Sequence, residues 1–172
     1  MSLSNAKIPV IGFVAQSGTG KTTLLTQLIP LLKQRGLRVA LIKHSHHDFE
    51  IDYPNKDSFR LRKAGASPVL LVSPFRRVMI TETPEQQEPM LNEQLNYLDQ
   101  TLLDLILVEG FKQETLLKIE VHRPSLNQSL LYPNDAHIVA VASDAPIIVP
   151  DYLTLLDLNQ VEQIADFILT LL

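Results

Sequence analysis

Short apolar runs alternate with helical patterns along the chain and predict its architecture. Five runs predict buried strands: Val10–Gln16, Leu37–Ile42, Leu105–Val108, Lys118–His122 and His137–Ala142. Between the first two, leucine and isoleucine recur at helical spacing until Gly36, which suits the end of a helix. A strand, a helix and a second strand in this order form one step of a parallel sheet. We therefore expect an α/β fold with a mostly parallel sheet flanked by helices.

The middle of the chain departs from this pattern. Ser58–Ala64 predicts a short helix that stops at Gly65. Two apolar runs, Pro68–Ser73 and Arg77–Thr81, are separated by a turn-forming tripeptide, which is typical of a β-hairpin. We expect this hairpin, at about residues 68–82, to be an insertion in the parallel design and to form an edge or a dimer surface.

Two further helices are predicted from their starting residues. Thr83-Pro84-Glu85-Gln86 places Thr at the cap, Pro at the first helical position and Gln at the capping-box position. This helix is expected to run to about Asp99, with a break at Pro89. A final amphipathic helix is expected after a cap at Asp157 or Asn159.

Composition narrows the class of protein. The 172 residues suit a single domain, 1–172, and are too few for two ordinary ones. The net charge of −4 and the lack of a basic face argue against nucleic acid as a partner. There is no cysteine, no apolar run of membrane-spanning length and no signal-peptide pattern at the start. We expect a cytoplasmic protein that binds neither nucleic acid nor membranes.

A glycine-rich turn follows the first strand and carries the strongest chemical signal. Residues 15–22 have the Walker A spacing, with Ala15 in place of the usual first glycine. Here Lys21 would reach the β- and γ-phosphates of a nucleotide, and the Thr22 hydroxyl would bind Mg²⁺. The alternative is a glycine-rich turn with a capping Thr. The expected phosphate loop consists of Gln16, Ser17, Gly18, Thr19, Gly20, Lys21, Thr22 and Thr23.

An acidic residue follows a buried strand later in the chain. Leu105–Val108 leads directly into Glu109 and Gly110, as in a Walker B motif. The Glu109 carboxylate would bind Mg²⁺ or its water, and the Gly110 amide could approach the γ-phosphate. A solvent-facing Glu at a strand end is the alternative.

A polar loop follows the second predicted strand and contains His44, His46, His47 and Asp48. Ligands of open α/β sheets bind beyond the carboxyl ends of the strands, so this loop is well placed to sense the γ-phosphate. Asp48 would then bind Mg²⁺ or its water. A solvated loop and a transition-metal site remain the alternatives.

The last predicted strand ends at Asp144. A carboxylate there can accept hydrogen bonds from guanine N1 and N2, which would favour GTP over ATP. The alternative is a turn-forming role for Asp144 before Pro146.

A second class of function uses the same phosphate loop, namely a small-molecule kinase or an ATP-dependent ligase. A kinase usually needs an arginine-bearing lid, and no clear lid segment contains the candidates Arg60, Arg62, Arg76 and Arg77. Arg60 and Arg62 could bind an anionic substrate or lie on a solvated helix face. Residues 123–134 are expected to form a loop, disordered or in contact with a partner, without diagnostic content.

Four stretches together resemble the MobB family of molybdopterin-guanine dinucleotide biosynthesis adaptor proteins: AQSGTGKTTLLTQLIPLL, LIKHSHHDFEIDYPNKDSFRLRKAGA, MITETPE and LDLILVEGFK. The resemblance implies a P-loop NTPase fold and a weakly hydrolysing, GTP-binding homodimer, while Mg²⁺ is expected from the two motifs above. It implies Gln16–Thr23 as the phosphate loop and Glu109 as the switch acid. With the Walker A motif, Lys21 and Glu109 are the expected catalytic residues. The implied partner is the molybdenum cofactor guanylyltransferase, which joins GMP to molybdopterin, with molybdopterin itself and molybdoenzymes as further partners.

Overall fold

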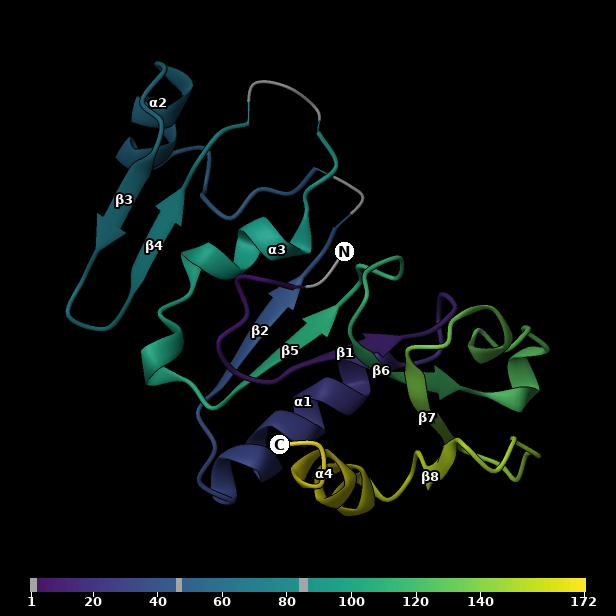
Figure 1. The fold of residues 1–172 in the computed structure, drawn as a ribbon. Coiled ribbons are helices and arrows are strands. Elements are labelled where there is room, and N and C mark those ends of the chain that lie inside the picture. Colours follow the sequence, from purple (N-terminus) through teal and green to yellow (C-terminus); the bar gives the residue numbers. More distant parts are fainter. Residues whose placement is uncertain (1–2, 46–47, 84–86) are drawn as a thin grey trace. The chain divides into compact units, whose positions relative to one another are not determined.

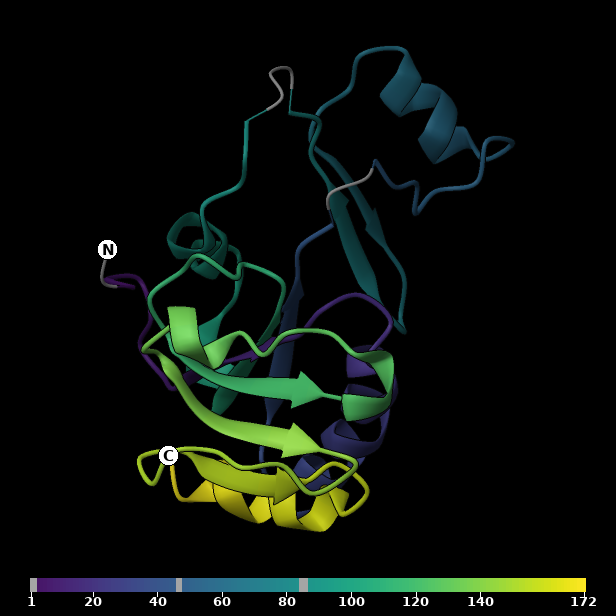
Figure 2. The ribbon, with the colours of Figure 1, turned by 90° about the vertical axis from the view of Figure 1, so that its right-hand side faces the viewer.

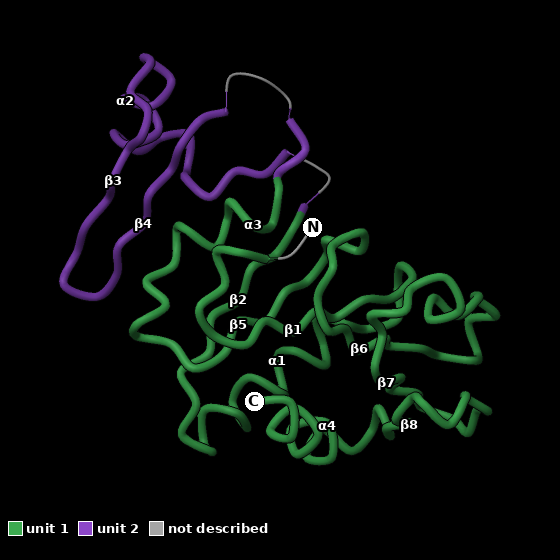
Figure 3. The backbone as a smooth tube through the Cα atoms, in the orientation of Figure 1, with its two compact units in different colours: residues 1–44, 90–172 green, residues 45–89 purple. Residues whose placement is uncertain are grey.

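The computed structural model describes residues 3–45, 48–83 and 87–172. Contacts divide the chain into two compact units (Figure 3): unit 1 is Met1–His44 with Met90–Leu172, and unit 2 is Ser45–Pro89. Within the described residues, no helix is both long and apolar enough to span a membrane. The two units are described in turn.

Unit 1 is built on a six-stranded parallel sheet (Figure 1). Its spatial order is β2-β5-β1-β6-β7-β8, and every neighbouring pair is parallel. The expected parallel α/β sheet is therefore confirmed. The strands are β1 (Val10–Val14), β2 (Val39–Lys43), β5 (Leu105–Glu109), β6 (Leu117–His122), β7 (Ile138–Ser143) and β8 (Thr154–Asp157).

Two helices cover one face of this sheet (Figure 2), namely α1 (Lys21–Gln34) and α4 (Val161–Leu169). Helix α1 packs four buried leucines against inward-facing residues of β1 and β5, and α4 contributes Ile164 and Ile168 to the same core. Helix α4 begins after Gln160, so the prediction that Asp157 or Asn159 caps this helix was wrong. Asp157 ends strand β8 instead, and its carboxylate accepts a hydrogen bond from the Asn159 amide.

The opposite face carries short helical segments. Helix α3 (Leu91–Gln94) continues into the 3₁₀ turns η1 (Leu95–Tyr97) and η2 (Gln100–Leu102). Leu91 and Leu95 pack on the β5 residues Ile106 and Val108. The prediction of a helix that starts at Thr83 was wrong. Residues 87–90 are not helical, and the helix starts only after Pro89. The expected first-turn residues 84–86 lie outside the described residues.

Unit 2 contains helix α2 (Asp57–Lys63) and a hairpin of β3 (Val69–Val72) and β4 (Arg77–Ile80). The two strands pair antiparallel, which confirms the expected hairpin. On α2, Arg62 is buried and its guanidinium pairs with both Glu50 and Glu82.

These contacts revise the expected roles of the two arginines on α2. Arg62 is neither solvated nor available to an anionic substrate, because two carboxylates of its own unit bind its guanidinium. Arg60 is exposed, as expected for the solvated face, and its guanidinium lies 3.8 Å from the Asp57 carboxylate.

Candidate functional site

The loop between β1 and α1 has the backbone of a phosphate cradle. Gly18 and Gly20 have φ of 80° and 92°, a left-handed conformation that side-chain-bearing residues rarely adopt. Gly20 caps α1, and its carbonyl accepts the first helical hydrogen bond, from the Leu24 amide, at 3.0 Å. Buried Thr19 stiffens the loop by donating its hydroxyl to the Gln16 carbonyl at 3.1 Å. Such a loop directs successive N–H groups into one concavity at a helix N-terminus.

The two predicted nucleotide motifs meet at the carboxyl edge of the sheet. Strand β1 pairs with β5 in a register that places Phe13 opposite Glu109, and α1 starts just beyond. The Thr22 hydroxyl donates to Glu109 Oε1 at 3.4 Å, and Lys43 Nζ lies 3.2 Å from Glu109 Oε2. The Glu109 side chain is largely buried, so it does not lie on a solvated strand end.

Basic side chains surround this point. Burial lowers the pKa of Lys21, and the positive charges of Lys112 and Lys43 lower it further, while Glu109 acts in the opposite direction. The lysines repel one another in the free protein, so an anion placed among them would relieve that repulsion. This electrostatic arrangement suits a polyphosphate.

The turn after Glu109 is tightly packed against His44. A Cβ at Gly110, which has φ of 98°, would lie 2.7 Å from the His44 Cβ. The Phe111 ring stacks on the imidazole of His44 with centroids 4.7 Å apart, and the His44 amide donates to the Glu109 carbonyl at 2.8 Å. The start of the histidine loop is therefore joined to the Glu109 turn.

Three other residues of that loop were predicted to act at this site, namely His46, His47 and Asp48. His46 and His47 lie outside the described residues. Asp48 belongs to unit 2, where its carboxylate accepts a hydrogen bond from the Phe49 amide at 2.9 Å. Among the described residues, no group of three or more His, Asp or Glu side chains could hold a metal ion by itself.

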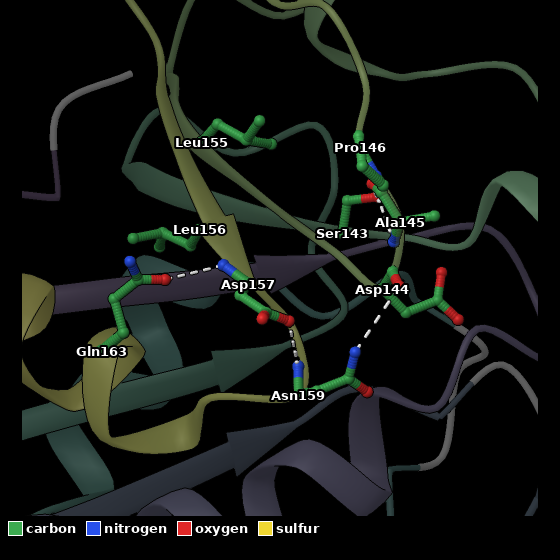
Figure 4. Close-up of a pocket in the computed structure, with 9 residues that line it drawn as sticks. All are labelled: Ser143, Asp144, Ala145, Pro146, Leu155, Leu156, Asp157, Asn159 and Gln163. Atoms are coloured by element: carbon green, nitrogen blue, oxygen red, sulfur yellow. Dashed lines mark hydrogen bonds between the residues drawn. The ribbon is translucent and has the colours of Figure 1, made fainter.

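Asp144 lies at the carboxyl end of β7 beside a pocket of about 360 Å³ (Figure 4). The Asn159 side chain donates to the Asp144 carbonyl at 3.5 Å, and Gln163 accepts from the Asp157 amide at 2.7 Å. The lining residues are Ser143, Asp144, Ala145, Pro146, Leu155, Leu156, Asp157, Asn159 and Gln163.

Two side chains outside the predicted motifs reach the phosphate loop. Arg123 Nε donates to the Thr19 carbonyl at 2.8 Å, and its Nη1 pairs with the Asp144 carboxylate. Gln128 Nε2 donates to the Ser17 carbonyl at 3.1 Å. Residues 123–134 are thus not a loop without diagnostic content; they contain the 3₁₀ turns η3 (Pro124–Leu126) and η4 (Tyr132–Asn134). The position of Arg123 directly after a predicted strand was the available signal.

Comparison with known proteins identifies the family. The model of the family MobB, "Molybdopterin guanine dinucleotide synthesis protein B", matches residues 10–144. The chain belongs to the MobB family. An Escherichia coli (strain K12) relative, named molybdopterin-guanine dinucleotide biosynthesis adapter protein, is 48% identical over 94% of this chain and 91% of its own. A Haemophilus influenzae relative of the same name is 46% identical over 95% of this chain and 89% of its own.

Solved structures agree with this assignment. A crystal structure of molybdopterin-guanine biosynthesis protein B (mobB) has a TM-score of 0.72 and 30% sequence identity. The match covers 95% of this chain and 99% of that one. The P-loop NTPase fold expected for this MobB chain is thereby confirmed.

Proposed function

We propose that this MobB protein is a GTP-binding adaptor, with weak GTPase activity, in the biosynthesis of molybdopterin guanine dinucleotide. The contact between Thr22 and Glu109 carries the proposal, because it joins the start of α1 to the end of β5 beside the phosphate loop. The names of the E. coli and H. influenzae relatives support the pathway.

The side chains at this contact fit magnesium. Hydroxyl and carboxylate oxygens are the hard ligands that Mg²⁺ prefers, and it commonly takes only one or two from protein with the remainder from phosphates and water. Thr22 and Glu109 would hold the ion, which would neutralise phosphate charge, while Lys21 would bind the β- and γ-phosphates.

Asp144 is the proposed reader of the base. Its carboxylate follows β7 on the same edge of the sheet as the phosphate loop, two strands from β1. A carboxylate accepts from the N1–H and N2–H₂ groups of guanine, and adenine offers no such donor pair. Selectivity for GTP would follow.

The proposed assembly is a homodimer that assists the molybdenum cofactor guanylyltransferase, with molybdopterin and molybdoenzymes as further partners. The proposed nucleotide-binding domain is the single domain of residues 1–172, with the hairpin at about residues 68–82 as an insertion between β2 and α3. The hairpin of unit 2 exposes apolar side chains on one face, including Leu70, Val72 and Met79, which supports a contact with a second copy.

Calorimetric titrations of GTP and ATP, each with and without Mg²⁺, test the nucleotide proposal. We expect magnesium-sensitive GTP binding and an affinity for ATP weaker by about ten-fold or more. Lys21→Ala should abolish binding, whereas Lys33→Ala, an exposed lysine in the last turn of the same helix, should not change it. Equal affinities for the two nucleotides, or retained binding in Lys21→Ala, would refute the proposal.

Glu109→Gln separates metal binding from nucleotide binding. The amide keeps the size of the side chain and removes its charge, so we expect GTP affinity without Mg²⁺ to persist and the magnesium-dependent gain and GTP hydrolysis to fall. Release of inorganic phosphate measures hydrolysis. Transfer of labelled γ-phosphate to a small-molecule acceptor would instead indicate a kinase.

A further inference from the structure

One short segment, residues 123–128, holds two carbonyl groups of the phosphate loop. Arg123 Nε binds the Thr19 carbonyl at 2.8 Å, and Gln128 Nε2 binds the Ser17 carbonyl at 3.1 Å. Both side chains are partly buried, and both contacts join residues more than 100 positions apart. The loop is thus held from the β6–β7 connection and not only by its own strand and helix.

Planarity of the peptide bond makes these two contacts informative. In a trans peptide the carbonyl and the following N–H point in opposite directions. A donor on the Ser17 carbonyl therefore fixes the direction of the Gly18 N–H, and a donor on the Thr19 carbonyl fixes that of the Gly20 N–H. Glycine is the residue whose backbone is most costly to order, so these are the two amides that gain most from being held.

The same guanidinium also reaches the end of β7. Arg123 Nη1 donates to Asp144 Oδ2, while Nε serves the Thr19 carbonyl. A guanidinium is planar and rigid, so a displacement of one partner is transmitted to the other. The side chains of Arg123 and Asp144 are only 34% and 21% exposed, which limits competition from water.

We propose that Arg123 is a positioning residue that couples the Asp144 end of β7 to the phosphate loop, so that a base held at Asp144 and phosphates held by the loop bind cooperatively. The coupling rests on the proposed function for its ligand, a purine nucleoside triphosphate. The arrangement that carries it is present in the free protein. The loop order and the ligand affinities can therefore be tested separately.

Backbone ¹⁵N relaxation of the ligand-free protein is the first test. We expect the Gly18 and Gly20 amides to be ordered in the wild type and to lose order in both Arg123→Gln and Asp144→Asn. The matched control is Arg38→Gln, because Arg38 forms a comparable pair with Asp104, with its Nη2 2.8 Å from Oδ1, before β5. Unchanged order in Arg123→Gln, or an equal loss in Arg38→Gln, would overturn the proposal.

Affinity for magnesium tripolyphosphate, which has no base, is the second test. A residue that only reads the base cannot affect this ligand, so Asp144→Asn should weaken it only if Asp144 acts through Arg123. We expect both Asp144→Asn and Arg123→Gln to weaken it by about ten-fold, the loss typical of one charge-assisted hydrogen bond. Arg123→Lys retains the charge but cannot contact both partners as the guanidinium does. Its affinity for magnesium tripolyphosphate should lie between the affinities of these two variants and that of the wild type.

The outcomes distinguish this inference from the proposed function. Asp144→Asn could lose GTP affinity while its tripolyphosphate affinity and the order of Gly18 and Gly20 stay unchanged. That outcome would show that Asp144 reads the base only, and it would refute the coupling. A wild type that binds no nucleotide would refute the proposed function, and the relaxation data would still decide whether Arg123 orders the loop. If Arg123→Gln does not fold, Arg123→Lys gives the same relaxation comparison.

Discussion

At the scale of single residues, the protonation of Lys21 links the site to pH. Burial lowers its pKa below the usual 10.5 in the free protein. Phosphates favour the charged ammonium, so binding would raise this pKa and take up a proton. We expect the affinity for GTP, measured by calorimetry between about pH 7 and pH 10, to fall as pH rises through the lowered pKa.

Lys21→Arg is the control for this prediction. Arginine remains charged throughout this pH range. The variant therefore removes the contribution of Lys21 to the pH dependence of GTP affinity, while the titration of the nucleotide itself remains. The affinity of Lys21→Arg should therefore fall less steeply with pH than that of the wild type. Identical slopes would show that Lys21 is not the titrating group.

The sequence was sufficient to place Lys21, Thr22 and Glu109 near one another, because local motifs and the rule for carboxyl strand ends determine their position. It was not sufficient for Arg123. Its contact with Thr19 spans 104 residues and depends on β6 lying next to β1 in the sheet. That order is a property of the assembled sheet and not of any single stretch of chain.

At the scale of elements, apolar patterns predicted the strands with inward-facing β-branched and leucine residues. They missed β8, because Thr154 and Leu155 at its start are exposed and the strand has four residues only. The capping signal at Thr83 predicted a helix start too far upstream, because Pro89 interrupts the pattern and the helix begins only after it. Short elements at the margin of a sheet gain their structure from neighbours rather than from local propensity.

The structure of unit 2 depends on contacts of the buried Arg62 side chain. Its guanidinium joins three segments of the unit: Glu50 before α2, the helix itself and Glu82 after β4. We expect Arg62→Ala to destabilise this unit, because the truncation leaves two carboxylates without their shared partner and removes packing on Phe59. Hydrogen exchange across residues 45–89 should accelerate, while the sheet of unit 1 should exchange at the wild-type rate.

Arg60→Ala on the same helix is the matched control. Arg60 is 77% exposed and its pair with Asp57 is a surface contact, so its loss should hardly change exchange in unit 2. Equal exchange in the two variants would mean that Arg62 does not organise the unit.

At the scale of the whole molecule, the proposed homodimer depends on the outward face of the hairpin. Val72 is 71% exposed, and Leu70 and Met79 lie opposite each other on the same face of the ribbon. Phe75, in the turn between the two strands, is 91% exposed. A two-stranded ribbon is marginally stable by itself in water, so covering its apolar face with a second copy would stabilise both.

Val72→Asp tests this assembly by sedimentation velocity. The side chain points outward, so the hairpin should still form, while a carboxylate on the covered face should raise the dissociation constant by at least about ten-fold. Ile148→Asp is the control, since Ile148 is a 95% exposed apolar residue of unit 1. A wild type that sediments as a monomer would refute the proposed homodimer. A dimer that is lost in Ile148→Asp and retained in Val72→Asp would place the interface away from the hairpin. Dissociation in Val72→Asp but not in Ile148→Asp would show that the hairpin forms the dimer interface. The proposed nucleotide site would then be separate from that interface, because its residues belong to unit 1, namely Lys21, Thr22, Glu109 and Arg123.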